Sequence, residues 1–334
     1  MRRNRRLAAF SATLFLFLAG CAENAPQDYL RPEGPVARQI DSLINPVFVV
    51  AGVVFVLVQG LVLYVIVKFR ARPDSPEPEQ VHGNTRLEVG WTLVPALILV
   101  CVAVPTIATI FDIAREPENP VNVTVTARQF WWEYTYDDLG VVTANELRMP
   151  VGRPVYLTLH SVDVIHSYWI PKLVGKMDVV PGRSNRMHVI ADTPGEYLGQ
   201  CTEFCGDSHA NMRNKAIAMT PADFDAWVAG QRAPAPTPAP GSPAEEGLTV
   251  YNQRGCGSCH AVAGLSTGDI GPDLTHFATR TTFAGSMLAN NDANLRRWLS
   301  DPQGVKPGNK MIIPGGRLSP DEVTQLIAYL NTLR

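Results

Sequence analysis

One short loop of this chain reads Gln200-Cys201-Thr202-Glu203-Phe204-Cys205-Gly206-Asp207-Ser208-His209-Ala210-Asn211-Met212 and carries two thiols, an imidazole and a thioether. A second imidazole, that of His166, lies upstream beside Asp163 on an apolar, strand-like stretch. Soft sulfur ligands combined with imidazole select copper or zinc over hard cations. Zinc prefers four ligands in a closed tetrahedron and has no use for a thioether, whereas Met beside Cys and His is typical of copper electron-transfer sites. The pattern therefore predicts a copper site.

The two thiols of this loop allow a metal pair rather than a single ion. If both thiolates bridge two coppers, each copper receives two sulfurs and one His nitrogen, and Met212 and a backbone carbonyl remain as weak axial donors. An exported protein can instead oxidise a Cys pair to a disulfide. A disulfide has no need of His209 and Met212 so soon after Cys205, so the copper pair is the favoured interpretation.

A second redox motif, Cys256-Gly257-Ser258-Cys259-His260, lies nearer the C-terminus. Cys-x-x-Cys-His is the attachment sequence of c-type haem, in which two thiols add to the vinyl groups and the adjacent imidazole reaches the iron. His260 is therefore the predicted proximal ligand. We expect Met311 as the sixth ligand, because it lies in a turn-rich loop and because Met and His ligation raises the potential of haem. Met287, before an Asn-rich stretch, is the alternative.

The N-terminus has the composition of an export signal. Residues 1–20 begin with clustered arginines, continue as an apolar run and end just before Cys21, which predicts a lipoprotein-type signal peptide with Cys21 as the lipidated first residue. Cleavage at a simple Ala-type site is the competing interpretation. Of the six cysteines, two are assigned to copper, two to haem and one to lipid, and Cys101 lies in an apolar helix. No pair remains for a disulfide.

Two long uncharged stretches, 47–67 and 91–111, are each long enough to cross a hydrocarbon core of about 30 Å. They predict a transmembrane α-helical hairpin over residues 47–112, preceded by a periplasmic segment over residues 21–46. Basic residues flank the connection at Lys68, Arg70, Arg72 and Arg86. The positive-inside rule then places the connection in the cytoplasm. This predicts a multi-pass protein of the bacterial inner membrane with its metal domains on the periplasmic side.

Three further segments follow the hairpin in the chain of 334 residues. Residues 117–230 show short alternating runs with Pro and Gly breaks, which predict an all-β, cupredoxin-like Greek-key sandwich. Residues 231–246 are rich in Pro and Ala, the composition of a semi-rigid linker that lets the next domain swing. Residues 247–334 predict an all-α, class I cytochrome c domain around one haem. The net charge of -2 gives no reason to expect a nucleic-acid partner.

Together the two metal motifs resemble cytochrome c oxidase subunit II, in the variety with a cytochrome c domain fused at the C-terminus. The resemblance spans nearly the whole mature chain. It implies a dinuclear copper A centre whose ligands are the side chains of His166, Cys201, Cys205, His209 and Met212 and the backbone carbonyl of Glu203. It also implies that the carboxylate of Glu203 faces a magnesium ion shared with subunit I.

The resemblance implies roles for residues away from the metals as well. Glu88 corresponds to a carboxylate at the entrance of a proton path into subunit I, although its position alone fits an interfacial charge equally well. Residues 127–136 resemble the aromatic block through which electrons enter. Phe130 stands where mitochondrial-type relatives carry the entrance Trp, so Trp131 or Trp132 is the candidate. Aromatic residues on a strand more often serve packing.

The implied function is that of the electron-transfer subunit of a haem-copper terminal oxidase. Electrons would pass from a cytochrome bc complex or a cytochrome c through haem c to copper A, and on to subunit I, where oxygen reduction is coupled to proton translocation. Subunits I and III and membrane lipid are the implied partners. A copper delivery protein for oxidase assembly is the alternative, but it has no use for Met212, the hairpin or the haem. Nitrous oxide reductase needs a large catalytic domain that is not encoded here.

Overall fold

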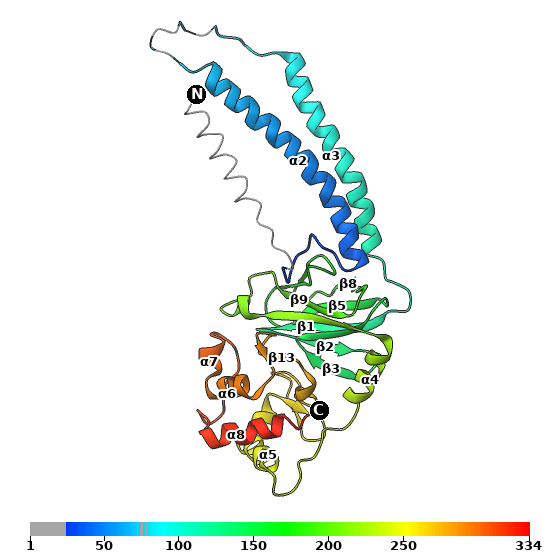
Figure 1. The fold of residues 1–334 in the computed structure, drawn as a ribbon, viewed down its shortest axis with the longest axis vertical. Helices are drawn as coiled ribbons and strands as arrows, with labels where there is room; N and C mark the ends of the chain where they lie inside the picture. The colour runs from blue at the N-terminus through cyan, green and yellow to red at the C-terminus, as the bar shows by residue number, and fades with distance from the viewer. Residues whose placement is uncertain (1–24, 72, 74–75, 78) are drawn as a thin grey trace, which may run out of the picture.

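The computed structural model describes residues 25–71, 73, 76–77 and 79–334. The described residues form a pair of long helices, a β-sandwich at one end of that pair and a smaller helical domain beyond the sandwich (Figure 1). The predicted signal peptide and Cys21 lie outside the described residues. We call residues 121–231 the sandwich domain and residues 243–334 the C-terminal domain.

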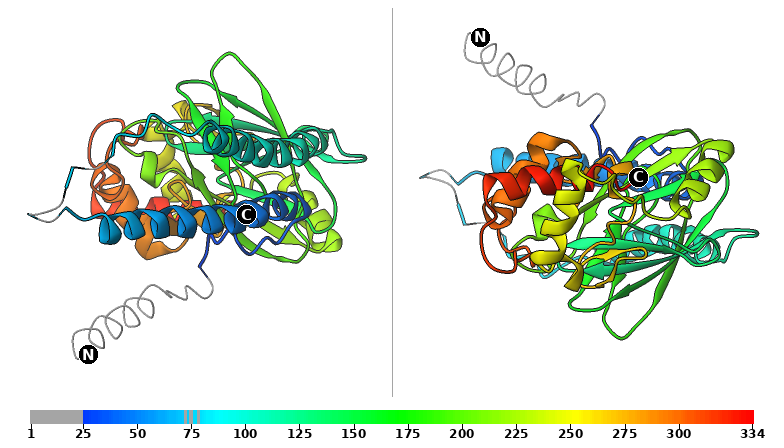
Figure 2. Two further views of the ribbon diagram at one scale, coloured as in Figure 1. Left: turned by 90° about the horizontal axis from the view of Figure 1, so that it is seen from above. Right: turned by 90° about the horizontal axis from the view of Figure 1, so that it is seen from below.

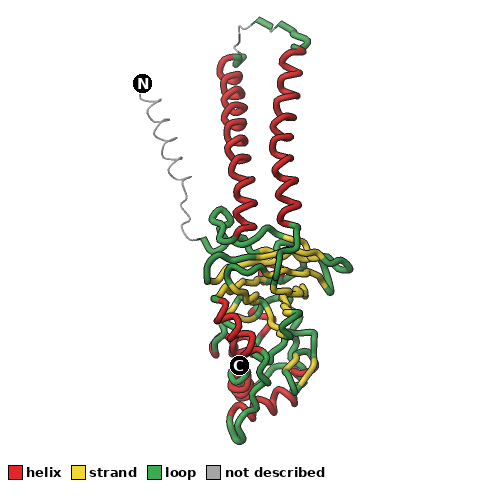
Figure 3. Tube along the Cα trace, turned by 90° about the vertical axis from the view of Figure 1, so that its right-hand side faces the viewer, coloured by secondary structure: helices red, strands yellow, loops and turns green. Residues whose placement is uncertain are grey.

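The long helices are α2 (Pro35–Lys68) and α3 (Thr85–Ile113), which run side by side as a hairpin (Figures 1 and 3). In the described residues they are the two helices long and apolar enough to cross a membrane, and their most apolar windows are not buried by the rest of the chain. Each apolar surface therefore needs lipid or another subunit to cover it. The predicted transmembrane hairpin is confirmed as an architecture.

The helix ends follow from local chemistry. Pro35 occupies the first turn of α2, where a missing N–H costs nothing. The helix therefore begins before the apolar stretch that starts at residue 47, and residues 35–46 form its first turns. Asn84 caps α3 by accepting the backbone N–H groups of Arg86 and Leu87. At the other end of the hairpin, Gln39 Nε2 donates to Asp112 Oδ2 at 2.9 Å and joins the two helices.

The base of the hairpin is fixed to the sandwich domain. Lys172 Nζ donates to Glu33 Oε1 at 2.6 Å, and the backbone N–H of Glu33 donates to the carbonyl of Lys172 at 2.8 Å. Arg38 forms an ion pair with Asp192. Val36 joins the apolar core of the sandwich domain. The orientation of α2 relative to the sandwich is therefore set by several independent contacts.

The sandwich domain consists of two five-stranded sheets formed by residues 121–219, with strand orders β3-β2-β1-β5-β8 and β4-β10-β9-β6-β7. β1 runs parallel to β5 and β10 parallel to β4, and the other pairs are antiparallel. The strands are β1 (Val121–Arg128), β2 (Trp131–Tyr136), β3 (Val141–Ala144), β4 (Glu146–Pro150), β5 (Val155–Ser161), β6 (His166–Trp169), β7 (Met177–Val179), β8 (Asn185–Val189), β9 (Gly195–Cys201) and β10 (Arg213–Met219).

The core between these sheets follows from the two-residue period of a strand. Trp132, Tyr134 and Tyr136 alternate along β2, and all three are fully buried. Buried aromatic side chains of this size contribute much of the apolar area in a small core. Helix α4 (Pro221–Gln231) closes the domain, and the ring of its Trp227 lies 5.2 Å from that of Tyr136. The cupredoxin-like sandwich is confirmed.

The C-terminal domain begins with α5 at Pro243, inside the predicted linker, because Ser242 caps the helix by accepting the N–H of Glu245. In the view from below in Figure 2, α8 (red) lies beside α5 (yellow). The rings of Tyr251 and Tyr329 meet between them, with centroids 5.6 Å apart. The predicted helical cytochrome c domain is confirmed, with two short ladders added. Its elements are α5 (Pro243–Gln253), η2 (Cys256–Ser258), β11 (Ala261–Val262), β12 (Ser266–Thr267), η3 (Phe277–Thr279), β13 (Thr282–Phe283), β14 (Leu288–Ala289), α6 (Asp292–Ser300), α7 (Pro302–Val305) and α8 (Pro320–Leu330).

The C-terminal domain packs directly against the sandwich domain (Figure 1). Arg148 Nη2 donates to the carbonyl of Thr279 at 2.9 Å, and Gln231 Nε2 donates to Thr279 Oγ1 at 3.1 Å. Residues 232–242 connect the domains without helix or strand. The composition of the linker predicted a swinging domain, whereas the structure shows a docked one.

Candidate metal centres

The loop that carries the sulfur ligands joins β9 to β10 and contains a short helical turn, η1 (His209–Asn211). We call residues 201–212 the copper loop. Its two ends are tied together by the N–H of Cys201, which donates to the carbonyl of Met212 at 2.9 Å. The N–H of Thr202 donates to the carbonyl of Ser167 on β6, at 3.0 Å. Since β6 begins at His166, this bond brings the distant imidazole to the loop.

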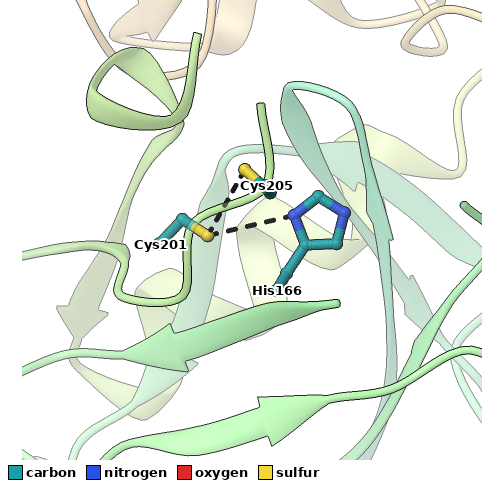
Figure 4. A group of neighbouring side chains, drawn as sticks. All are labelled: His166, Cys201 and Cys205. Carbon is teal, nitrogen blue, oxygen red and sulfur yellow. Dashed lines mark hydrogen bonds between the residues drawn. The ribbon is translucent and has the colours of Figure 1, made fainter. Parts of the chain in front are cut away.

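The five predicted side-chain ligands form one cluster. The sulfur atoms of Cys201 and Cys205 lie 3.8 Å apart. His166 Nδ1 lies 3.9 Å from Cys201 Sγ, and His209 Nδ1 lies 3.6 Å from Cys205 Sγ. Met212 Sδ lies 3.9 Å from Cys205 Sγ. Figure 4 shows the side chains of His166, Cys201 and Cys205 pointing toward one another. The ligand atoms of these three residues all lie within 4.8 Å of one another.

The surroundings of the cluster suit a buried soft-metal site. His166, Cys201, Cys205 and Met212 are all buried, which excludes water from the donor atoms. The carbonyl oxygen of Glu203 lies 3.3 Å from Cys201 Sγ, so this backbone group also faces the cluster. Both thiols are free, and their separation is far from the roughly 2.05 Å of a disulfide. The residues present therefore fit a copper pair bridged by two thiolates.

The two thiols do not ionise independently. The hydrogen bond between the two thiols lowers the pKa of Cys201 well below its ordinary value. The resulting Cys201 thiolate, together with burial, raises the pKa of Cys205 above its ordinary value. The Cys205 thiol therefore holds its proton more tightly than the Cys201 thiol does. Cations bound by both sulfurs must displace that proton, so metal loading depends on pH.

Asp163 orients the imidazole of His166. His166 Nε2 donates to Asp163 Oδ1 at 2.7 Å, which leaves Nδ1 with its lone pair toward Cys201. Burial alone would lower the pKa of His166, but the bonds to Asp163 and Cys201 raise it above its ordinary value. For Asp163, burial opposes ionisation, but hydrogen bonds from His166 and from the N–H groups of Val164 and Gln129 lower its pKa.

The second predicted centre is a cavity in the C-terminal domain. Its lining includes Cys256, Cys259, His260 and Met311, so the structure brings the predicted haem residues to one space. We call this space the haem cavity. Among the described residues that line it, Met311 is present and Met287 is not. Trp298 Nε1 donates to Met311 Sδ at 3.2 Å.

His260 is held ready to bind a metal. Its Nδ1 donates to the carbonyl of Pro272 at 2.7 Å, which leaves Nε2 as the atom with a lone pair. A Cβ at Gly271 would lie 2.5 Å from His260 Cε1, so only glycine lets this loop lie against the ring. Burial lowers the pKa of His260 and keeps the imidazole neutral.

Arg280 supplies a further test of the cavity. This side chain lines the cavity and is buried, yet its Nε has no hydrogen-bond partner among the described residues. Nη2 of the same guanidinium donates to the carbonyl of Asp273, but a buried charged group with a donor left unpaired is costly unless an anion completes the site. Haem carries two propionates, so the unpaired guanidinium nitrogen and the neutral His260 both fit haem as the occupant.

The sandwich domain forms one wall of the haem cavity. Gln129, Phe130 and Trp131 line the cavity together with residues of the C-terminal domain, and we call these three residues the shared wall. Gln129 Nε2 also donates to the carbonyl of Cys205 at 2.5 Å. The same side chain therefore touches the haem cavity on one side and the copper loop on the other.

A glycine of the copper loop makes this contact possible. Gly206 has φ +123°, in the region that disfavours other residues. A Cβ there would also lie 3.0 Å from Gln129 Nε2 and 3.2 Å from Phe130 Cζ. A larger residue at position 206 would push the copper loop away from the shared wall.

The two candidate tryptophans occupy different places. Trp131 belongs to the shared wall, with the guanidinium of Arg128 5.7 Å from its ring centroid. Trp132 is fully buried, and its ring lies edge-on to that of His166, with centroids 5.9 Å apart. The sequence offered both as alternatives, and the structure puts Trp131 at the haem cavity and Trp132 behind His166, a predicted copper ligand.

Comparisons with known proteins agree with both centres. A family model described as the periplasmic domain of cytochrome c oxidase subunit II matches residues 140–218, and one for its transmembrane domain matches residues 29–109. A cytochrome c family model matches residues 244–334. The chain is 42% identical over 330 residues to the cytochrome c oxidase subunit 2 of Alkalihalophilus pseudofirmus, covering 96% of this chain and 95% of that protein. The chain belongs to the cytochrome c oxidase subunit II family.

Two further similarities complete the comparison. The cytochrome c oxidase subunit 2 of Bacillus sp. strain PS3 is 35% identical over 352 residues, covering 99% of this chain and 98% of that protein. The solved periplasmic domain of subunit II of cytochrome oxidase from Bradyrhizobium japonicum is 27% identical, with a TM-score of 0.34, and the match covers 35% of this chain and 96% of that one. As a subunit II with a cytochrome c domain, the chain is part of a haem-copper terminal oxidase. It carries copper A and haem and is anchored in the membrane with a periplasmic domain.

Glu88 of this subunit II lies in the first turn of α3, at the end of the hairpin remote from the sandwich domain (Figure 1). Its Oε1 accepts the backbone N–H of Asn84 at 3.2 Å. Its carboxylate thus satisfies a free N–H group at the start of the helix. A local structural role accompanies any role in proton uptake.

Sequence reasoning assigned no role to several residues at these centres. Asp163 has a detectable signal, because a carboxylate three positions before a ligand His is able to orient its ring. Gln129 and Arg280 have no such signal, because their roles depend on contacts between segments far apart in the chain.

Proposed function

We propose that this chain passes electrons from a periplasmic donor through haem c to copper A and on to subunit I, where oxygen reduction is coupled to proton translocation. The main support for this proposal is that the shared wall lies between the haem cavity and the copper loop. Gln129 lines the haem cavity and donates a hydrogen bond to the carbonyl of Cys205. A route of covalent bonds and one hydrogen bond thus leads from the cavity to the copper loop.

Each centre would be held by residues that the structure already brings together. Copper A would be bound by the side chains of His166, Cys201, Cys205, His209 and Met212 and by the carbonyl of Glu203. Haem c would be attached to Cys256 and Cys259, with His260 and Met311 as axial ligands. When bound, copper A and haem c would each accept and donate one electron at a time. The protein orients them, keeps water away and fixes their ligand tautomers.

Several finer assignments belong to the same proposal. The carboxylate of Glu203 would face a magnesium ion shared with subunit I. Trp131, as part of the shared wall, is the better candidate for electron entrance, while Trp132 supports His166. Glu88 would lie at the entrance of a proton path.

The proposed setting is the bacterial inner membrane. α2 and α3 would both cross it, with the two metal domains on the periplasmic side and Cys21 carrying lipid. Subunits I and III would contact the subunit, and a cytochrome bc complex or a cytochrome c would supply its electrons.

Spectroscopy and rapid kinetics on the purified subunit test this proposal. We expect optical and electron paramagnetic spectra of one low-spin c-type haem and one mixed-valence copper pair, with matching metal content. After rapid reduction of the haem, its reoxidation should coincide with loss of the copper signal. A bound zinc ion, or a copper centre that stays oxidised while the haem is reduced, would contradict the proposal.

A further inference from the structure

Glu146 is the first residue of β4 in the sandwich domain, and its side chain is completely buried. Its Oε1 accepts hydrogen bonds from the backbone N–H groups of Thr281 and Thr282, at 2.9 and 2.8 Å. The same oxygen accepts the hydroxyl groups of Thr281 and Thr282, at 2.7 and 2.8 Å. All four donors belong to the C-terminal domain. One carboxylate oxygen of one domain is thus surrounded by donors of the other.

The counter-charges of Glu146 come from its own domain. Arg148 Nη2 lies 3.2 Å from Glu146 Oε2, and Lys215 Nζ lies 3.8 Å from Oε1. Lys215 is itself buried, and it donates to Thr281 Oγ1 at 2.5 Å. A buried carboxylate is tolerated only when it is both paired and hydrogen-bonded. The sandwich domain supplies the pairing and the C-terminal domain supplies most of the hydrogen bonds, so neither domain completes this site alone.

A second row of contacts lies beside the copper loop. The N–H of Arg213 donates to the carbonyl of Gly285 at 3.0 Å, and Ser208 Oγ donates to the carbonyl of Pro307. Gly285 has φ +76°, and a Cβ there would lie 2.7 Å from the carbonyl oxygen of Asn211. This glycine lets the backbones of the two domains approach each other closely. The close fit of the interface therefore depends on residues of both domains.

We propose that Glu146 is a positioning residue that holds the C-terminal domain in one fixed pose on the sandwich domain, with the haem cavity closed by the shared wall. The use of this pose for electron transfer rests on the function proposed above, whereas the pose itself does not. The linker between the domains then connects two parts already docked. The approach of the domains is not a diffusive step in each turnover.

Hydrogen exchange on the purified, metal-loaded full chain tests the pose. In the unmodified chain the amides of Thr281 and Thr282 should exchange slowly. Glu146→Ala removes a charged acceptor of four bonds, so we expect these amides to exchange about tenfold faster or more. Glu196→Gln is the matched control, because Glu196 is the other carboxylate partner of Lys215, at 3.0 Å, and receives no bond from the C-terminal domain. The control should exchange as the unmodified chain does.

A second variant, in the C-terminal domain, tests the same contact without removing the buried carboxylate of the sandwich domain. Replacing both Thr281 and Thr282 by Val removes the two hydroxyl donors and leaves the sandwich domain untouched, and it should accelerate exchange in the same region by a smaller factor. In every variant the amides of β1 and the copper spectrum report whether the sandwich domain is intact. Unchanged exchange at residues 281 and 282 in a folded Glu146→Ala chain would overturn the proposal.

Electron transfer in the assembled oxidase separates this proposal from the one on function. Flash-induced oxidation of the haem should slow in Glu146→Ala and keep its rate in Glu196→Gln. Faster exchange together with an unchanged electron-transfer rate would uphold the positioning role and contradict the proposed route through the shared wall. Slower electron transfer with unchanged exchange would contradict the positioning role alone.

Discussion

Lys306 of the C-terminal domain donates a hydrogen bond of 2.7 Å to the backbone carbonyl of Phe130 in the sandwich domain. The side chain is 3% exposed, and its second partner is the carbonyl of Ala284 at 3.1 Å. Two neutral carbonyls do not fully offset the loss of water around an ammonium. Burial accordingly lowers the pKa of Lys306 to about 7.

The docked interface should therefore become more stable as pH rises. An exposed lysine in the unfolded chain titrates near pH 10.4. Between about pH 7 and this value the unfolded chain binds more protons than the folded one, so the free energy of unfolding increases with pH. Thermal unfolding of the full chain at several pH values from 7 to 9 should show this slope. Lys306→Met should flatten it, and Lys310→Met, at an exposed neighbour, should leave it. Equal slopes in both variants would refute the assignment.

Loss of either thiol should abolish the copper pair. Cys201→Ser and Cys205→Ser each remove a sulfur that would bridge both ions, so the mixed-valence paramagnetic signal should disappear. Met212→Leu removes only a weak axial donor, so copper should remain bound with a shifted reduction potential. Metal analysis and paramagnetic spectra of the three variants measure this. An intact paired spectrum in Cys205→Ser would rule out bridging.

Asp163 should affect copper affinity through its hydrogen bond to His166. Asp163→Ala removes the carboxylate that fixes the ring of His166 and should lower copper affinity by about 10–100-fold. Asp163→Asn keeps an acceptor oxygen for Nε2 and should lose much less. Competition with a copper chelator measures the affinities. If both variants bind copper equally well, the hydrogen bond does not orient the ligand.

Met311 and Met287 form a matched pair for the sixth haem ligand. Met311→Leu should leave the haem attached through both thioethers but shift its reduction potential downward and change its visible spectrum. Met287→Leu removes an identical side chain that does not line the cavity, and it should change neither property. The reverse pattern would exchange their roles.

Glu88 should affect turnover more than structure. Glu88→Gln keeps an oxygen that is able to accept the N–H of Asn84, so the start of α3 should persist. The loss of an ionisable group should slow oxygen consumption by the assembled oxidase with unchanged copper and haem spectra. Asn84→Ala controls for helix capping, at a cost of about 1 kcal/mol, and should leave turnover unchanged. If the two variants slow turnover equally, Glu88 acts only as a helix cap.

The metal centres were largely predictable because their ligands sit in short motifs. The two thiols, the His209 imidazole and the thioether of the copper loop fall within one turn-rich segment, so the loop alone brings them close together. His166 was predicted as a ligand from its place on an apolar strand, and only the structure shows how the Thr202 to Ser167 bond brings it to the cluster. The haem motif is equally local.

The relation between the domains could not be predicted in the same way. Glu146 and Thr281 are 135 positions apart, and an acidic residue ahead of an alternating run looks like any polar strand end. Composition described the linker as an isolated segment and so favoured a swinging domain. Packing of the two domains is decided by buried charge and backbone fit, which appear in no local pattern.

The polar contacts at the base of α2 link the orientation of the sandwich domain to that of the helix hairpin. Helices respond to a thinner hydrocarbon core by increasing their tilt. Because the Glu33 to Lys172 bond and the Arg38 to Asp192 ion pair join the base of α2 to the sandwich domain, we expect a change in the tilt of α2 to turn that domain with it. In the membrane setting proposed above, the acyl-chain length of the surrounding lipid would therefore change the angle at which the copper loop faces subunit I.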